Sequence, residues 1–167
     1  MNYYFEVLKK YAVLSGRASR KEYWTFTLIN FAVAIVAGAT MAKLQNTVYS
    51  ALSGNGSVNL DLWLTVSMIA AIIVAIYALI MLIPSICVAV RRLHDTNRSG
   101  WWSLIIFAQV VLGLSKSFFN SGGFLYFLGF ISVVVSIVWL VFTLRDSQPG
   151  ENKYGPNPKE AQKLKTA

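Results

Sequence analysis

Three long stretches of the chain are built almost entirely from apolar side chains and contain no charged residue. They are Trp24–Ala42, Leu62–Val90 and Phe124–Leu144. A helix needs about 20 mostly apolar residues to cross the roughly 30 Å of bilayer hydrocarbon. Because lipid offers no partners for backbone N–H and C=O groups, a helix is expected even where Val and Ile dominate. The pattern predicts transmembrane helices over about 20–43, 61–90 and 123–144.

A fourth apolar stretch, Trp101–Leu114, is shorter than a bilayer requires. It reaches spanning length if the helix continues to Phe119, with Lys116 extending its ammonium group to the headgroups. We therefore predict an all-α fold, a four-helix transmembrane bundle whose third span covers about 101–119. Residues 1–148 form the membrane domain and 149–167 form a tail, because prolines and glycines after position 148 prevent a continuing helix.

The second predicted span is longer than the hydrocarbon is thick. As a helix, Leu62–Val90 would extend for about 43 Å, so it must tilt, bend or project beyond the lipid. Pro84 offers the bend, because proline lacks an amide donor and leaves the carbonyl of Ile80 without its helical partner. Within the spans, Asn30 and Gln109 are the polar side chains most costly to expose to lipid, and we expect them to face other helices.

The chain before the first span predicts a short amphipathic helix lying in the headgroup layer of the bilayer. The apolar residues of this helix recur at helical spacing, and they are Tyr4, Phe5, Leu8, Tyr11 and Ala12. Gly16 suits the left-handed conformation that ends a helix. Ser19 and Glu22 have the spacing of a capping box, in which each side chain accepts a backbone N–H of the other, so the first span should begin near Arg20.

The charged residues give the orientation of the spans. The chain holds 15 Lys and Arg against 7 Asp and Glu, for a net charge of +8. All of the basic residues except Lys43 and Lys116 fall before the uncharged stretch that begins at Trp24, between the second and third spans, or after the fourth. The positive-inside rule then places both termini and the Arg91–Gly100 loop in the cytoplasm. The basicity is therefore an orientation signal, and no nucleic-acid partner is expected.

Basic and aromatic residues gather at two places where a predicted helix enters the membrane from the cytoplasm, ahead of Trp24 and around Trp101. Arginine can fork two hydrogen bonds to a phosphate, and tryptophan settles at headgroup depth. This combination suggests a shared site for lipid phosphates or another anionic headgroup. The candidate residues are Arg17, Arg20, Arg91, Arg92, His94, Asp95, Arg98, Trp101 and Trp102. Topological anchoring explains the same pattern and is the more frequent role of such belts.

The chain offers little for metal or covalent chemistry. His94 and Cys87 are its only histidine and cysteine, which excludes a two-His or His/Cys zinc cage unless carboxylates supply ligands. Ser99, His94 and Asp95 are the residue types of a hydrolase triad, but no nucleophile elbow is present. A phosphate-binding glycine loop is also missing from the sequence. We therefore expect no catalytic residue, no metal and no cofactor.

The three predicted cytoplasmic segments resemble signature motifs of a known family. They are the runs Gly16–Trp24, Arg91–Trp102 and Gly150–Pro158. In these motifs, and over nearly its whole length, the chain is similar to the bacterial YhaH/YhaI-like inner-membrane proteins, domain of unknown function 805. Asn97 departs from the family pattern, in which Gly is more frequent at that turn. The resemblance implies a bacterial cytoplasmic membrane and supports four spans, and it brings no established activity, substrate or catalytic residue.

Three classes of function remain open on the sequence. The leading hypothesis is a non-enzymatic membrane module whose cytoplasmic face binds anionic lipid headgroups or a partner protein, with Asn152 and Tyr154 folding back as a lid. The second is a small-solute transporter or channel component, which such short spans would form as a homo-oligomer, although they lack the ionisable groups of coupled transporters. The third is a membrane-embedded enzyme that uses His94 and Asp95.

Overall fold

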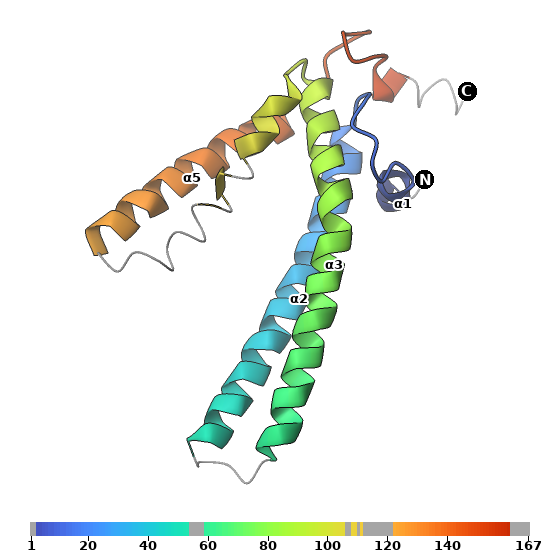
Figure 1. Cartoon of the computed structure of the whole chain (residues 1–167). Coiled ribbons are helices and arrows are strands. Elements are labelled where there is room, and N and C mark those ends of the chain that lie inside the picture. Colours follow the sequence, from blue (N-terminus) through green and yellow to red (C-terminus); the bar gives the residue numbers. More distant parts are fainter. Residues whose placement is uncertain (1–2, 54–58, 106–107, 110, 112–121, 161–167) are drawn as a thin grey trace.

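The computed structural model describes residues 3–53, 59–105, 108–109, 111 and 122–160, and the regular structure in these residues is helical (Figure 1). The elements are α1 (Tyr3–Lys9), α2 (Arg20–Leu52), α3 (Leu60–Asp95), the 3₁₀ helix η1 (Gly100–Ser103) and α5 (Gly122–Leu144). The all-α prediction is confirmed. Within the described residues, three helices are long and apolar enough to cross a membrane, and they are α2, α3 and α5.

The predicted third span is the part of the fold about which the structure says least. The residues described between Leu104 and Val111 are helical, and they follow η1 directly. The remainder of the predicted span 101–119 lies outside the described residues. The fourth predicted span, 123–144, agrees with α5 to within one residue.

The first predicted span begins where the sequence placed it and ends later. The capping box is formed: the Glu22 N–H donates to Ser19 Oγ at 3.3 Å, and the Ser19 N–H donates to the Glu22 carboxylate at 2.8 Å. The helix then continues past the predicted end at position 43 to Leu52. The polar residues there do not interrupt it, because Thr47 and Ser50 donate their hydroxyls to backbone carbonyls one turn earlier. The helix of 33 residues is about 50 Å long and exceeds the hydrocarbon thickness.

The helix that contains the second predicted span, 61–90, continues five residues beyond that span. The segment Arg91–Asp95, expected to be loop, is the last turn of α3. Arg92 and Asp95 stand three residues apart, so they share one face of the helix and pair at 2.5 Å. The helix ends at Asp95, Thr96 is its C-cap, and Asn97 follows with a φ of 58°. Asparagine accepts this left-handed conformation more readily than most residues, so it can stand where Gly was expected from the sequence.

Helix α3 continues through Pro84, and the carbonyl that proline deprives of its helical donor has another partner. The Tyr11 hydroxyl donates to the Ile80 carbonyl at 2.7 Å. The chain that follows α1 therefore supplies the donor that Pro84 lacks.

The two polar side chains expected to face other helices, Asn30 and Gln109, do so. Tyr77 of α3 donates to Asn30, and Gln109 donates to Ser136 and to a backbone carbonyl of α5.

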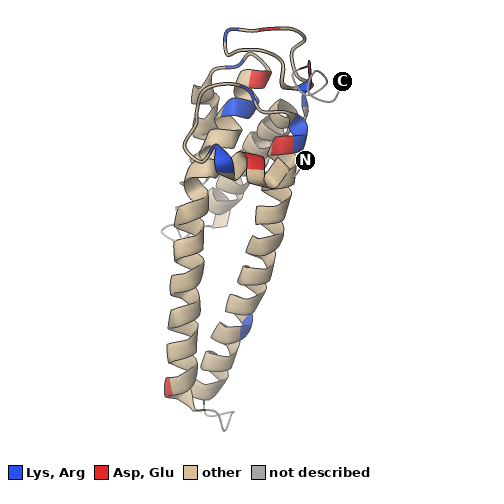
Figure 2. Ribbon diagram, turned by 90° about the vertical axis from the view of Figure 1, so that its right-hand side faces the viewer, with Lys and Arg blue, Asp and Glu red and all other residues tan. Residues whose placement is uncertain are grey.

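Charged residues gather at one end of the molecule, which we call the basic end (Figure 2). It holds the N-terminal segment, the last turns of α3 and α5, and the tail (Figure 1). The buried hydrophobic core also lies there, and its members are Val7, Ala18, Tyr23, Phe26, Val88 and Ala89. Helices α2 and α3 lie side by side, whereas α5 diverges from them with distance from the basic end (Figure 1). The described helices are therefore splayed and do not form a closed bundle, because apolar surfaces have no hydrophobic reason to associate in lipid.

Helix α1 is shorter than predicted and packs differently from the expected pattern. It ends at Lys9, and Val7, which does not belong to the predicted apolar face, is 1 % exposed and part of the core. Tyr4 stacks on Phe26 of α2 with ring centroids 5.3 Å apart. The helix is thus held against α2 at the basic end, while its position in the headgroup layer stays a prediction.

Candidate functional site at the basic end

Arg17 lies in the loop before α2 and is buried, with its side chain 1 % exposed. Its Nε donates to the Asp95 carboxylate at 3.0 Å. The two terminal nitrogens donate to four backbone carbonyls, which belong to Asp95, Gln148, Gly150 and Gly155. A guanidinium has five N–H donors, so Arg17 makes as many hydrogen bonds as its chemistry permits. It joins the end of α3 to the tail.

Arg92 binds the same carboxylate from within α3. Its Nη1 donates to Asp95 Oδ2 at 2.5 Å, and its Nε donates to the Thr143 carbonyl of α5 at 3.0 Å. The remaining terminal nitrogen donates to the Arg145 carbonyl just beyond α5. Arg92 and Asp95 have fully buried side chains. We call Arg17, Arg92 and Asp95 the arginine clasp, because together they tie the N-terminal loop, α3, α5 and the tail to one another.

Arg91 is also buried, but it stands apart from the clasp. Its Nε donates weakly to the Cys87 carbonyl at 3.4 Å, and its Nη2 has no partner among the described residues. It lies beyond Val90, where the uncharged part of α3 ends. Burial lowers the pKa of the Arg91 guanidinium, and the nearby Glu22 carboxylate acts in the opposite direction. Its backbone carbonyl accepts the N–H of Ala18, which fixes the loop against α3.

The tail folds back over the end of α3, as the lid hypothesis expects. The Gln148 N–H donates to the Asp95 carbonyl, and the Asn152 amide donates to the His94 carbonyl, both at 3.0 Å. Tyr154 stacks on the His94 ring with centroids 3.7 Å apart and ring planes 4° apart. Asn157 is buried and its amide donates to the Gln148 carbonyl, which holds the final turn in place.

His94 is half-buried at the edge of the clasp. Its Nδ1 lies 3.3 Å from the Gly16 carbonyl, and burial lowers the pKa of the imidazole, with Lys153 contributing in the same direction. The Asp95 carboxylate is occupied by two arginines, so it is not available to His94 as an acid–base partner. Within the residues that the structure describes, no three His, Cys, Asp or Glu side chains come close enough together to hold a metal ion.

Two tryptophans of η1 lie exposed at the basic end. Trp101 is 77 % exposed and Trp102 is 45 % exposed. Arg98 places its guanidinium carbon 3.8 Å from the centre of the Phe142 ring, and Trp102 meets the same ring edge-on. We call Arg98, Trp101 and Trp102 the aromatic rim. Gly100 brings η1 close to α3, because a Cβ at this position would lie 2.9 Å from a methyl group of Val90.

The nine residues predicted to form one face thus divide into several environments. The clasp residues and Arg91 are buried, and His94 supports the tail. Arg20 is partly exposed and pairs with Asp146 at 2.6 Å, next to a second ion pair between Asp146 and Lys159. The aromatic rim remains at the surface. The tail carbonyls that bind Arg17 were not predicted, because a backbone carbonyl has no signature in the sequence.

Comparison with known proteins places this architecture among membrane proteins. The profile of a family described as "Protein of unknown function (DUF805)" matches residues 11–156. The chain is 31 % identical to the inner membrane protein YhaH of Escherichia coli (strain K12), over 95 % of this chain and 98 % of the relative. It is 33 % identical to the inner membrane protein YhaI of the same organism, over 95 % of this chain and 97 % of the relative. No solved structure matches the chain.

Proposed function

We propose a function from the premise that the chain belongs to the DUF805 family of unknown function. In this proposal, the multi-pass inner-membrane protein is a non-enzymatic module that binds anionic phospholipid headgroups. The aromatic rim makes the contact, on the cytoplasmic face. The arginine clasp holds that face in a fixed shape, so its arginines act on the protein itself and leave lipid contact to residues further out. A partner protein is the competing occupant of the same face.

The topology in this proposal has four spans with both termini in the cytoplasm. Helix α3 ends at the basic end, and α5 also ends there, because Arg92 of α3 binds the Thr143 carbonyl. The 23 residues of α5 extend for about 34 Å, so its first residue lies far from the basic end. The chain between η1 and α5 must return over this distance, which supports a further crossing. The excess of basic residues at this end supports its cytoplasmic position.

The exposure of Trp101, three residues after an Arg98 that stacks on Phe142, is the observation that carries the proposal. Tryptophan is enriched at the level where helices leave the hydrocarbon, because its indole is amphipathic. A guanidinium stacked on a ring keeps its N–H donors along its edge, where they can form paired hydrogen bonds to a phosphate. In the aromatic rim, the tryptophans therefore set the depth in the membrane and the Arg98 guanidinium recognises the headgroup.

The test compares lipid retention by the full chain in nanodiscs of phosphatidylcholine and phosphatidylglycerol, followed by native mass spectrometry. We expect Arg98→Gln combined with Trp101→Ala to lower the retained phosphatidylglycerol several-fold. Lys43→Gln is the matched control, because it removes an exposed positive charge far from the basic end. Equal retention by all three proteins would refute headgroup binding, and a protein retained by the rim in place of lipid would favour the partner alternative.

The two other classes of function are less well supported. The enzyme hypothesis needs Asp95 to act on His94, and that carboxylate is already paired with two arginines. A His94→Ala variant that complements a deletion strain would remove its last support. The transporter or channel hypothesis stays a prediction, and flux of small solutes into proteoliposomes is its test.

A further inference from the structure

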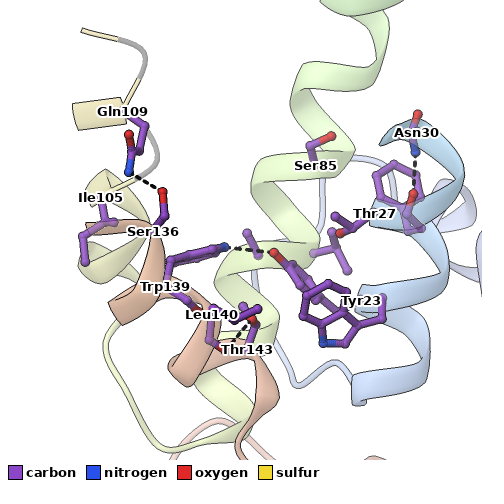
Figure 3. A pocket seen from close by; sticks show the side chains of 14 residues that line it. Tyr23, Thr27, Asn30, Ser85, Ile105, Gln109, Ser136, Trp139, Leu140 and Thr143 are labelled. Atoms are coloured by element: carbon purple, nitrogen blue, oxygen red, sulfur yellow. Dashed lines mark hydrogen bonds between the residues drawn. The ribbon is translucent and has the colours of Figure 1, made fainter. Parts of the chain in front are cut away.

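A pocket of about 380 Å³ lies between α2, α3, α5 and the helical residues that follow η1 (Figure 3). The volume falls in the range of small-molecule sites. Tyr23 and Trp139 form part of its wall, and the Trp139 indole N–H donates to the Tyr23 hydroxyl at 3.0 Å. The polar side chains around the rest of the pocket are Thr27, Asn30, Ser85, Gln109, Ser136 and Thr143.

The pocket lies within the apolar part of the protein, close to the basic end. Its α2 residues run from Tyr23 to Asn30, so they lie within about 16 Å of the start of the helix at Arg20. A distance of this size from the membrane surface is about the thickness of one leaflet of the bilayer. Molecules that reach the pocket from the side come from the bilayer.

The lining excludes an ionic ligand. None of the described residues that line the pocket carries a charge. An ion moved from water into such surroundings would lose its hydration without gaining an opposite charge. The ligand that suits the pocket is therefore uncharged.

The hydrogen-bonding groups of the lining favour a hydroxyl group. Ser85 donates its proton to the Met81 carbonyl, and Thr143 donates to the Trp139 carbonyl, so the lone pairs of both hydroxyl oxygens remain as acceptors. Trp24 also lines the pocket, and its buried indole N–H has no partner among the described residues. An alcohol both donates and accepts, so it can pair with either kind of group.

A second hollow of about 700 Å³ continues from the pocket toward the outer surface of the helices. The two share Ser136 and Leu140. The other residues of the second hollow include Phe31, Val133 and Ile137, all exposed and apolar. It offers a path for a hydrocarbon chain whose polar end occupies the inner pocket.

We infer that the pocket binds a neutral lipid alcohol, with the hydroxyl group between α3 and α5 and the chain in the outer hollow. Two kinds of membrane molecule have this chemistry, a diacylglycerol and an isoprenoid alcohol. The site is separate from the aromatic rim and takes an uncharged ligand, so it does not depend on headgroup binding.

The experiment measures binding to the full chain in phosphatidylcholine nanodiscs by native mass spectrometry. The probes are 1,2-dioleoylglycerol, geranylgeraniol and the methyl ether of 1,2-dioleoylglycerol, which lacks the hydroxyl donor. We expect one of the two alcohols to bind about tenfold more tightly than the ether, since the hydroxyl makes one or two hydrogen bonds. The preferred alcohol identifies the source, and equal binding of all three probes would overturn the inference.

A matched pair of double variants tests the place of binding. Ser85→Ala with Thr143→Val removes two acceptors from the pocket, and we expect about a tenfold loss of affinity for the preferred alcohol. Ser67→Ala with Thr40→Val removes two hydroxyls that bond to their own helix in the same way outside the pocket, and we expect no loss. Equal affinities in the two variants would overturn the assignment. The three-probe comparison on the unaltered chain applies even where a variant fails to fold.

Discussion

Helices α2 and α3 run from the basic end to the opposite end of the molecule. The polar groups of their halves far from the basic end, which we call the far halves, form hydrogen bonds in a different way from those at the basic end. In the far halves, Thr40, Thr47 and Thr65 each donate to a carbonyl of their own helix. At the basic end, Arg17 and Arg92 donate to segments distant in the sequence. The far halves can therefore move without leaving a buried group unpaired, whereas the basic end cannot.

This difference explains where the structure is compact. Helices in lipid gain little from burying apolar side chains against each other, so packing and polar contacts decide where they associate. Helix α5 approaches α2 and α3 where Trp139 bonds to Tyr23 and where Arg92 bonds to the end of α5, and it diverges beyond those contacts. The basic end is therefore the part of the molecule in which polar contacts fix the helices relative to one another.

The largest expected effect comes from removing the shared carboxylate. Asp95→Ala leaves Arg17 and Arg92 buried without their counter-ion, which should cost about 3–5 kcal/mol of the free energy of unfolding. Thermal unfolding of the protein in detergent is the measurement. Asp61→Ala, at the exposed opposite end of α3, is the control, with an expected change within about 0.5 kcal/mol. Similar losses in both variants would show that the clasp has no special role.

A smaller loss should follow from separating η1 from α3. Gly100→Ala places a Cβ against Val90, with an expected cost of about 1–3 kcal/mol. Adding Val90→Ala should recover part of that loss, because it removes the methyl group that the Cβ meets. Gly129→Ala in α5, where a Cβ meets nothing within 4 Å, should not destabilise the protein. The same unfolding measurement distinguishes these outcomes, and an absence of recovery would contradict the assigned contact.

The attachment of the N-terminal segment to α3 should contribute about 1 kcal/mol. Tyr11→Phe removes the donor to the Ile80 carbonyl and leaves that carbonyl unpaired. Pro84→Ala supplies a backbone N–H for the same carbonyl, so Tyr11→Phe should cost less in that background. A double-mutant cycle on the free energy of unfolding measures this coupling. A cost that is the same in both backgrounds would show that the two groups act independently.

The smallest effect concerns the pH dependence of tail docking. Burial lowers the pKa of His94 below its ordinary value of 6.5, so the folded protein favours the neutral imidazole. The contribution of His94 to docking is complete above the ordinary pKa and declines as the pH falls from there toward the lowered value. The protection factors of the tail amides, which correct the exchange rate for its intrinsic pH dependence, should therefore fall as the pH drops below about 6.5. His94→Phe, which keeps a ring for Tyr154 and cannot titrate, should remove the dependence.

Sequence reasoning predicted the elements that depend on local patterns. The capping box at Ser19 and Glu22, the extent of α5 and the interhelical bonds of Asn30 and Gln109 follow from residue type and spacing. The uncharged stretches also indicated a membrane protein, which the relatives confirm.

The environment of the arginines could not be predicted in the same way. Arg91 and Arg92 follow an apolar stretch, a pattern typical of exposed basic residues at a membrane boundary. The burial of Arg92 depends on the carbonyls of Thr143 in α5 and of Arg145 just beyond it, which lie more than 50 residues away in the sequence. The partner of the Ile80 carbonyl likewise depends on how two distant segments pack, which single-sequence patterns do not specify.

The bonds of Arg17 also order the biogenesis of the protein. Three of its acceptors lie at positions 148, 150 and 155, behind every described membrane helix, so they emerge from the ribosome after those helices. Until then, one of the earliest arginines to be synthesised has donors that still face water. Assembly therefore has two stages, insertion of the helices and later closure by the tail. A chain shortened before Gln148 would insert and remain open, in a form that cellular quality control can recognise.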